Sequence, residues 1–207
     1  MAKASLRSRK KQLTRDRIVA AALQLFQTRG FDATTTKAIA RKAGIAEGTV
    51  FNYFATKEDI ALHFFELELD HAISAVRGNR RLRKAPLEER LFVLVESQLE
   101  YLAAHERFIG AALVHALKPA SRLGPFSPKS HQLQTKYLAF VQELVDEAIA
   151  TGALSPMAWW TPTVFWVYYL GILLFWLHDQ SPGKQMTLAL LDRSLKIGVA
   201  MLAAEGR

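Results

Sequence analysis

The stretch that most constrains the fold runs from Thr34 to Lys57, TTTKAIARKAGIAEGTVFNYFATK, and contains two short helical patterns. Thr35 can cap the first helix, because its hydroxyl can accept a hydrogen bond from a backbone N–H that the first turn leaves unpaired. Gly44 is expected to end that helix, since glycine adopts the left-handed conformation without a Cβ clash. A second helix of about seven residues is then expected to begin near Glu47 after a tight turn.

Neither helix is long enough to be stable alone in water, because nucleation is costly and each forms few internal hydrogen bonds. Ile39, Ala40 and Ala43 fall on one face of the first helix, and Val50 and Phe54 face inward on the second. The two helices must therefore pack on other elements. The spacing is typical of a helix-turn-helix that presents its second helix to the DNA major groove, but it also fits a generic helical hairpin.

The residues themselves favour the first interpretation. The run T-T-x-x-I-A-x-x-A-G-I-x-x-G-T-x-F-x-Y-F-x-x-K-E resembles the DNA-binding half of TetR-family transcriptional regulators, and the similarity extends from Thr14 to Ile60. It includes a preceding helix that ends in Gly30-Phe31. The resemblance implies an all-α protein with a three-helix helix-turn-helix domain over residues 14–60 and a helical effector-binding and dimerisation domain over 61–207.

The resemblance also implies DNA contacts from both short helices and the start of the next helix, at Thr35, Thr36, Lys37, Glu47, Gly48, Thr49, Phe51, Asn52, Tyr53 and Lys57. Hydroxyl and ammonium groups in this set are expected to bind phosphates and to set the register. Asn52 can pair with adenine and Glu47 can accept from the cytosine amino group, although an acid in a first turn also simply favours the helix dipole. Gly48 would allow close approach, and the Phe51 ring could meet a thymine methyl group.

Two positions depart from the commonest pattern of the family. Ala46 stands where a serine usually caps the second helix, which is expected to cost about 0.5–2 kcal/mol of local stability. Phe51 stands where a tyrosine is frequent, so one phosphate hydrogen bond is expected to be missing. Both changes concern DNA affinity rather than the fold.

Charge is unevenly distributed along the chain. Residues 1–60 carry 12 Lys and Arg against 5 Asp and Glu, whereas residues 61–207 carry 15 against 14, so +7 of the net charge of +8 lies in the first part. A basic front part indicates a polyanionic partner. Residues 1–13 are predicted to be a flexible basic arm that reaches DNA phosphates or a minor groove, or else a disordered tail that improves solubility.

The remaining chain shows only helical patterns, which brings the predicted total to about nine helices. The expected ranges are 56–76, 87–104, 106–117, 130–151, 163–178 and 182–203. The segment from Arg77 to Lys84, RGNRRLRK, is a basic linker that either contacts phosphate or forms a solvated turn.

The last two helices are predicted to form a homodimer interface, because the final helix has two apolar strips and its partner is apolar nearly all round. The proposed contacts are Trp166, Leu170, Leu174, Leu188, Leu191, Leu195, Val199 and Leu202, and a second strip holds Leu190, Ile197 and Met201. The resemblance implies a two-fold dimer built on a four-helix bundle. Its two recognition helices would then lie about 34–36 Å apart on a pseudo-palindromic operator of double-stranded DNA.

Aromatic residues are frequent in the second domain. Most must be core or interface, but together they suggest an apolar cavity with a few polar groups, lined by His105, Phe108, Tyr137, Phe140, Trp166 and Tyr169. By analogy with the family, a hydrophobic or aromatic small-molecule effector would bind there and move the recognition helices out of register.

Other function classes find little support. No catalytic motif is present, the six histidines match no zinc motif, and there is no cysteine, so neither an enzyme nor a metal or cofactor site is expected. The apolar run from Val164 to Leu177 is shorter than the roughly 20 residues of a membrane span, so no membrane association is expected. We therefore expect a cytoplasmic, effector-released repressor. An architectural or nucleoid-associated DNA-binding protein is the alternative, followed by a membrane-associated protein.

Overall fold

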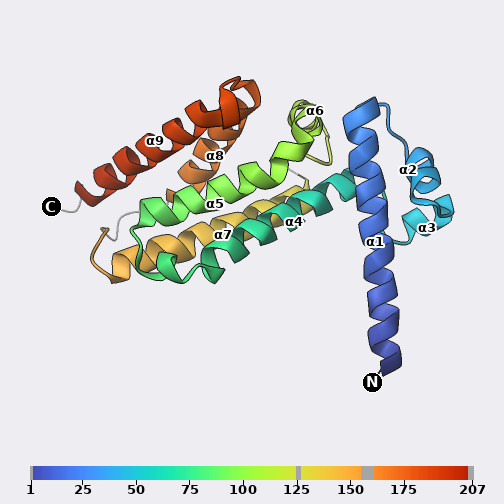
Figure 1. The fold of residues 1–207 in the computed structure, drawn as a ribbon, viewed down its shortest axis with the longest axis horizontal. Helices are drawn as coiled ribbons and strands as arrows, with labels where there is room; N and C mark the ends of the chain where they lie inside the picture. The colour runs from blue at the N-terminus through green and yellow to red at the C-terminus, as the bar shows by residue number, and fades with distance from the viewer. Residues whose placement is uncertain (1, 125–126, 155–160, 205–207) are drawn as a thin grey trace. The chain divides into compact units, whose positions relative to one another are not determined.

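A computed structural model describes residues 2–124, 127–154 and 161–204, and all regular structure in this part of the chain is helical (Figure 1). The all-α fold class is therefore confirmed. The α-helices are α1 (Ala2–Arg29), α2 (Thr36–Ala43), α3 (Glu47–Phe51), α4 (Lys57–Gly78), α5 (Leu87–Leu102), α6 (Glu106–Ala116), α7 (Pro128–Ala150), α8 (Thr161–His178) and α9 (Gln185–Ala204). Short 3-10 helices follow α4 (η1, Arg80–Lys84) and α5 (η2, Ala103–His105) and precede α9 (η3, Pro182–Lys184).

The chain divides into two compact units. The first combines Met1–Leu67 with His105–His131, and the second combines Glu68–Ala104 with Gln132–Arg207. This division differs from a single boundary after residue 60, because the segment 105–131 joins the N-terminal part of the chain.

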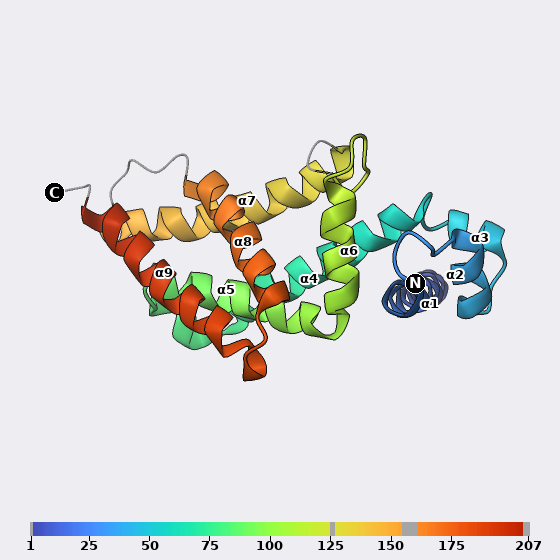
Figure 2. The same cartoon turned by 90° about the horizontal axis from the view of Figure 1, so that it is seen from above.

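In the first unit, α1 buries one apolar stripe, with Ile18, Ala22 and Phe26 fully inaccessible to solvent. Helix α2 packs on α1, and α3 packs on α2 (Figure 2). The expectation of a flexible arm over residues 1–13 is corrected, because α1 already begins at Ala2. Residues 5–13, SLRSRKKQL, contain no glycine or proline and are rich in good helix formers, which allows the helix to extend N-terminally.

The segment 105–131 joins this unit through Phe108 of α6. Its ring is fully buried, with its centroid 4.9 Å from that of Phe26, 5.9 Å from Phe31 and 5.8 Å from Phe64. The Phe108 backbone N–H also donates to Gln27 Oε1 at 3.0 Å. Aromatic packing and long-range hydrogen bonds from Arg107 and Phe108 to Gln27 therefore fix α6 to the end of α1.

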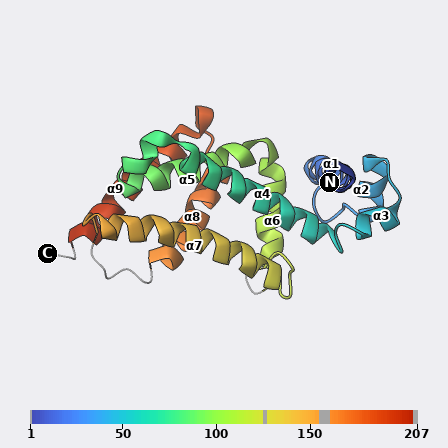
Figure 3. The ribbon, with the colours of Figure 1, turned by 90° about the horizontal axis from the view of Figure 1, so that it is seen from below.

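In the second unit, α7 runs parallel to the later part of α4. Lys136 Nζ lies 2.6 Å from Asp70 Oδ1, and Arg77 Nη2 lies 2.6 Å from Glu143 Oε2. The two ion pairs are separated by the same number of residues on α4 and on α7, as expected for helices that run side by side in the same direction. Figure 3 shows α4, α5 and α7 extending in nearly the same direction. Helix α9 packs on α5 (Figure 1), and α8 crosses α7 and α5 (Figure 2).

The two apolar strips predicted for α9 face in different directions. Leu191 and Leu195 are buried within the protomer, where α9 packs on α5, so these two residues cannot contact a second copy. Trp166, Leu170, Leu188, Val199 and Leu202 are half-buried, and Leu174 is exposed. The outward strip of α9 contains Met186 together with Leu190, Ile197 and Met201, which form the second strip predicted from the sequence.

None of the helices within the described ranges combines the length and the apolar character that a bilayer-spanning helix requires.

Candidate DNA interface and effector site

The helix-turn-helix is closed by local caps at the predicted positions. Thr35 Oγ1 accepts a hydrogen bond from the Ala38 N–H at 3.1 Å and so caps α2. Gly44 ends α2 with φ 67° and ψ 38°, and the next residue, Ile45, donates from its N–H to Ala40 O at 3.1 Å. Arg17 of α1 adds a bond that the sequence pattern did not predict, from Nη2 to the Ala43 carbonyl at 2.5 Å. These bonds satisfy the free carbonyls at the end of α2 and fix the turn.

Helix α3 is shorter than predicted, with five residues from Glu47 to Phe51. Its inward side chain, Val50, is fully buried, and Phe54 just beyond it is 6% exposed. Ala46 precedes the helix and makes no side-chain capping bond, as expected from the sequence. Because such a short helix forms few internal bonds, the packing of Val50 and Phe54 must hold it.

All ten residues predicted to contact DNA lie outside the core, since each is exposed or half-buried. Phe51 is a large apolar side chain with 51% of its surface exposed on α3. The side chains of Lys37 and Asn52 make no hydrogen bond or ion pair within the described residues. The space around Gly48 is also open, because a Cβ there would meet nothing within 4 Å. This part of α2 and α3 can therefore accept an external partner.

Two residues of the predicted set bind each other across the turn. Thr36 Oγ1 donates to Glu47 Oε1 at 2.9 Å, which joins the first turn of α2 to the first turn of α3. The Thr36 proton is thus already used, although the hydroxyl oxygen can still accept. This bond favours a structural role for Glu47 over base reading, and it supplies a connection at the end of α3 that lacks a cap.

Lys57 has a different environment from the one expected for a phosphate-binding residue. Its Nζ donates to Phe31 O at 2.8 Å and to Asp32 O at 3.0 Å, and it lies 4.8 Å from the centroid of the Phe31 ring. These contacts close the turn after α1. A phosphate contact by Lys57 would require these bonds to break, so we assign it to the support of the fold.

The six predicted effector-binding residues separate into groups. Tyr137, Trp166 and Tyr169 come together in the second unit, with ring centroids 5.2–5.8 Å apart. Phe140 lies under the guanidinium of Arg77, whose Cζ is 5.1 Å from the ring centroid.

His105 and Phe108 lie apart from these four residues. Both belong to the first unit, where the ring of His105 packs edge-on against that of Phe64 at 5.1 Å and Phe108 fills the aromatic core. Sequence spacing could not distinguish this core from a ligand site, because aromatic residues serve in both.

A buried polar cluster, which the sequence analysis did not identify, lies among α4, α5 and α7. Glu68, Gln98 and Tyr137 are each at most 4% exposed, and the Gln98 side chain hydrogen-bonds the Glu68 carboxyl. Burial raises the pKa of Glu68 to about 8, so this group is mostly uncharged at neutral pH. Glu68 Oε1, Gln98 Oε1 and the Tyr137 hydroxyl have no hydrogen-bond partner within the described residues. Unsatisfied polar atoms in a core are costly, so native proteins usually pair them with water, an ion or another group.

The comparisons with known proteins agree with the fold. Residues 18–64 match the family described as bacterial regulatory proteins, tetR family, and residues 90–205 match the tetracyclin repressor-like C-terminal domain. The fatty acid metabolism regulator protein of Bacillus subtilis (strain 168) is 25% identical over 138 residues, covering 67% of this chain and 69% of that protein.

Two solved structures are also similar. The complex of Thermus thermophilus FadR with lauroyl-CoA has a TM-score of 0.61 and 25% identity, and the match covers 86% of this chain and 92% of that chain. FadR from Bacillus subtilis in complex with stearoyl-CoA has a TM-score of 0.68 and 22% identity over 88% and 96%, which shows a common fold.

The raised pKa of Glu68 predicts a stability that depends on pH. The folded protein keeps this proton up to about pH 8, whereas the unfolded chain releases it near 4.5, so folding takes up a proton between these values. The free energy of unfolding should therefore fall as pH rises through this window, by a few kcal/mol, on the order of 1.4 kcal/mol for each pKa unit. Glu68→Gln should remove this fall and be more stable than the wild type at pH 8.

Urea denaturation at pH 5, 6, 7 and 8 measures the difference in the free energy of unfolding between the wild type and Glu68→Gln. Titratable groups that both proteins share contribute equally and cancel in this difference. Glu89→Gln, at an exposed position of α5, is the matched control and should follow the wild type. If the free energy of unfolding changed with pH equally in the wild type and in Glu68→Gln, the assignment of a buried, protonated Glu68 would be contradicted.

Proposed function

We propose that this chain, which belongs to the TetR family of DNA-binding transcriptional regulators, is a cytoplasmic homodimeric repressor that an apolar effector releases from a pseudo-palindromic operator. The family is not enzymatic, and the C-terminal domain match extends over most of the second half of the chain. The observation that carries the operator proposal is the exposed outer side of α3, with Gly48, Phe51 and Asn52, on a helix held in place by Val50.

Within this proposal the exposed residues have separate roles. Asn52 is the best candidate for reading a base, because its amide has no partner within the described residues and can form two hydrogen bonds with adenine. Lys37, Thr49 and Tyr53 are proposed to bind phosphates and Phe51 to contact an apolar base edge. Thr35 and Gly48 would let the backbone approach the DNA.

Asn52→Ala and Lys37→Ala should have different effects on DNA binding. Asn52→Ala should lose about 1–3 kcal/mol of discrimination at one base position, whereas Lys37→Ala should weaken binding to all sequences and lower the salt slope by about 1. Competition binding to operator variants at several salt concentrations measures both quantities. Lys42→Ala, at an exposed position of the same helix, is the control and should change neither. If Asn52→Ala weakened binding to every DNA sequence by the same amount, base reading by Asn52 would be excluded.

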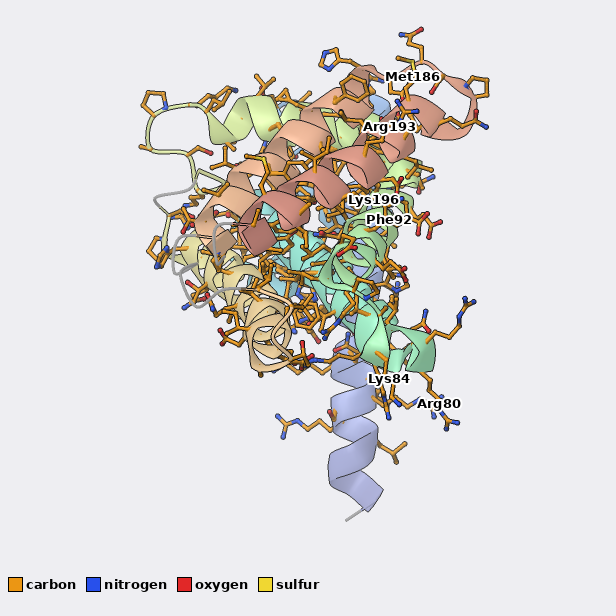
Figure 4. The ribbon with its side chains drawn as sticks, turned by 90° about the vertical axis from the view of Figure 1, so that its left-hand side faces the viewer. Arg80, Lys84, Phe92, Met186, Arg193 and Lys196 are labelled. Atoms are coloured by element: carbon orange, nitrogen blue, oxygen red, sulfur yellow. The ribbon has the colours of Figure 1, made fainter. Side chains whose placement is uncertain are left out.

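The homodimer proposal is supported by apolar surface that one protomer leaves exposed. On α8 the exposed residues are Val164, Val167, Leu174 and Phe175, and on α9 they are Met186, Leu190, Ile197 and Met201. Figure 4 shows Met186, Arg193 and Lys196 along α9, so charged residues accompany the outward strip. Contiguous apolar surface on two neighbouring helices is typical of a protein–protein interface. A two-fold axis through this pair would bury it in both copies.

Ile197→Glu should convert the dimer into monomers, because it places an unpaired charge in the proposed interface. Ile197 is 61% exposed in the protomer, so the substitution should leave the fold intact. Sedimentation equilibrium measures the mass, and operator affinity should fall with the loss of the second recognition helix. Val114→Glu, at an equally exposed apolar position of α6, should remain dimeric. A dimer with unchanged affinity in Ile197→Glu would place the interface elsewhere.

The effector proposal is supported by the second unit and by the relatives. The second unit holds the aromatic cluster of Tyr137, Trp166 and Tyr169 beside the uncharged, incompletely bonded Glu68. Two FadR proteins of the same fold were solved with lauroyl-CoA and stearoyl-CoA. We therefore propose an effector with an acyl or similar apolar chain.

Lauroyl-CoA is the first probe of effector control. It should release the protein from a selected operator and raise the melting temperature, as ligand binding to the folded state requires. Fluorescence anisotropy with labelled operator measures release, and free coenzyme A controls for the effect of anions. Unchanged anisotropy across a panel of acyl and aromatic compounds, at operator-saturating protein, would favour the architectural alternative.

A further inference from the structure

A cleft in the second unit is bordered by the basic segment RGNRRLRK, to which the DNA-binding function gives no role. The cleft has a volume of about 400 Å³, within the range of about 300–1,000 Å³ that small-molecule sites occupy. It lies among the end of α4, η1, the start of α5, and α7. The lining residues are Val76, Arg77, Leu82, Arg83, Arg90, Phe140, Glu143, Leu144 and Glu147.

The lining is amphipathic. Val76, Leu82, Phe140 and Leu144 are buried apolar residues that form one part of it, and five charged residues form the rest. Such a site suits a ligand that has an apolar portion and a charged portion. A DNA backbone would supply only the charge, so the apolar residues indicate a small amphiphile.

The charges in the cleft favour an anion. Arg77 and Arg90 neutralise the two glutamates through ion pairs of 2.6 Å, Arg77 with Glu143 and Arg90 with Glu147. Arg83 then remains, because its guanidinium makes no hydrogen bond or ion pair within the described residues. In the same part of the chain, Arg90 Nε is also buried without a hydrogen-bond partner.

The surroundings increase this positive potential. From Arg77 to Arg90 there are six cationic residues against two acidic ones, Glu88 and Glu89, a net charge of +4. Figure 4 shows Arg80 and Lys84 extending from η1, on the same side as Phe92 of α5, and both are exposed. Arginine forms paired hydrogen bonds with phosphate oxygens, and several nearby cations suit a group with more than one negative charge.

The cleft is also aligned with the buried polar cluster. Val76 lies eight residues after Glu68 on α4, which corresponds to about 12 Å along a helix. On α7, Phe140 and Leu144 follow Tyr137 by three and seven residues, so all three lie on one face. The apolar wall of the cleft and the buried polar cluster therefore occupy neighbouring stretches of α4 and α7.

We propose that this cleft binds the phosphate-bearing end of a phosphorylated amphiphile, such as a coenzyme A thioester, with Arg83 as its main anion contact. The proposal rests on the acyl effector suggested above and adds the position of its charged group. The apolar lining receives the first part of the chain, and the arginines hold the phosphates.

The test compares Arg83→Glu with Arg81→Glu in the full-length protein. Arg81 is an exposed residue of the same 3-10 helix that does not line the cleft, so the two variants change the net charge equally. Isothermal titration with lauroyl-CoA, free coenzyme A and dodecanoate is performed without DNA, after melting curves confirm that both variants fold. Arg83→Glu should weaken lauroyl-CoA binding by at least about tenfold, the loss expected for one charged hydrogen bond, and Arg81→Glu by much less.

The three ligands separate the sources of binding. Weaker binding of lauroyl-CoA and free coenzyme A to Arg83→Glu, with dodecanoate binding unchanged, supports a phosphate site in the cleft. Equal affinities of the two variants for lauroyl-CoA, or no binding to the wild type, would overturn it. Because DNA is absent, binding that depends on Arg83 supports the cleft even if lauroyl-CoA fails to release the operator.

Discussion

The burial of Val50 and Phe54 is the constraint on which the DNA-binding part of the protein depends. Helix α3 has five residues and no side-chain cap, so its own hydrogen bonds cannot maintain it. It exists because its apolar side packs inward and because Thr36 bonds to Glu47 across the turn. The same packing turns Phe51 and Asn52 outward, which makes them available for a partner. The stability of the fold and the proposed DNA contacts therefore arise from opposite sides of one short helix.

The first unit contains more than the helix-turn-helix. Phe108 of α6 packs among rings from α1, from the turn after it and from α4, and Gln27 accepts its backbone N–H. Lys57 closes the same turn from the start of α4. A movement of α4 or α6 must therefore disturb the support of α1 and of the short helices. Within the first unit, one packed core therefore links α6 and the start of α4 to the support of α3.

Sequence reasoning succeeded where the chemistry is local. The Thr35 cap and the Gly44 stop both formed as the residues indicated. It failed where the answer depends on distant parts of the chain. The leucine strip of α9 was correctly seen as apolar, but only packing on α5 shows that Leu191 and Leu195 face inward.

The same limit applies to the buried polar cluster. On α4, Leu67 is half-buried and His71 is exposed, so a three-residue step does not follow the inward face. The buried positions instead recur every four residues, and Glu68 occupies one of them, a signal that was available in the sequence.

The direct test of the proposed DNA recognition by α3 is selection of bound sequences from a random DNA pool at a stated salt concentration. The account predicts a palindromic consensus whose half-sites are one helical turn apart, and a pool with no enriched sequence would contradict it.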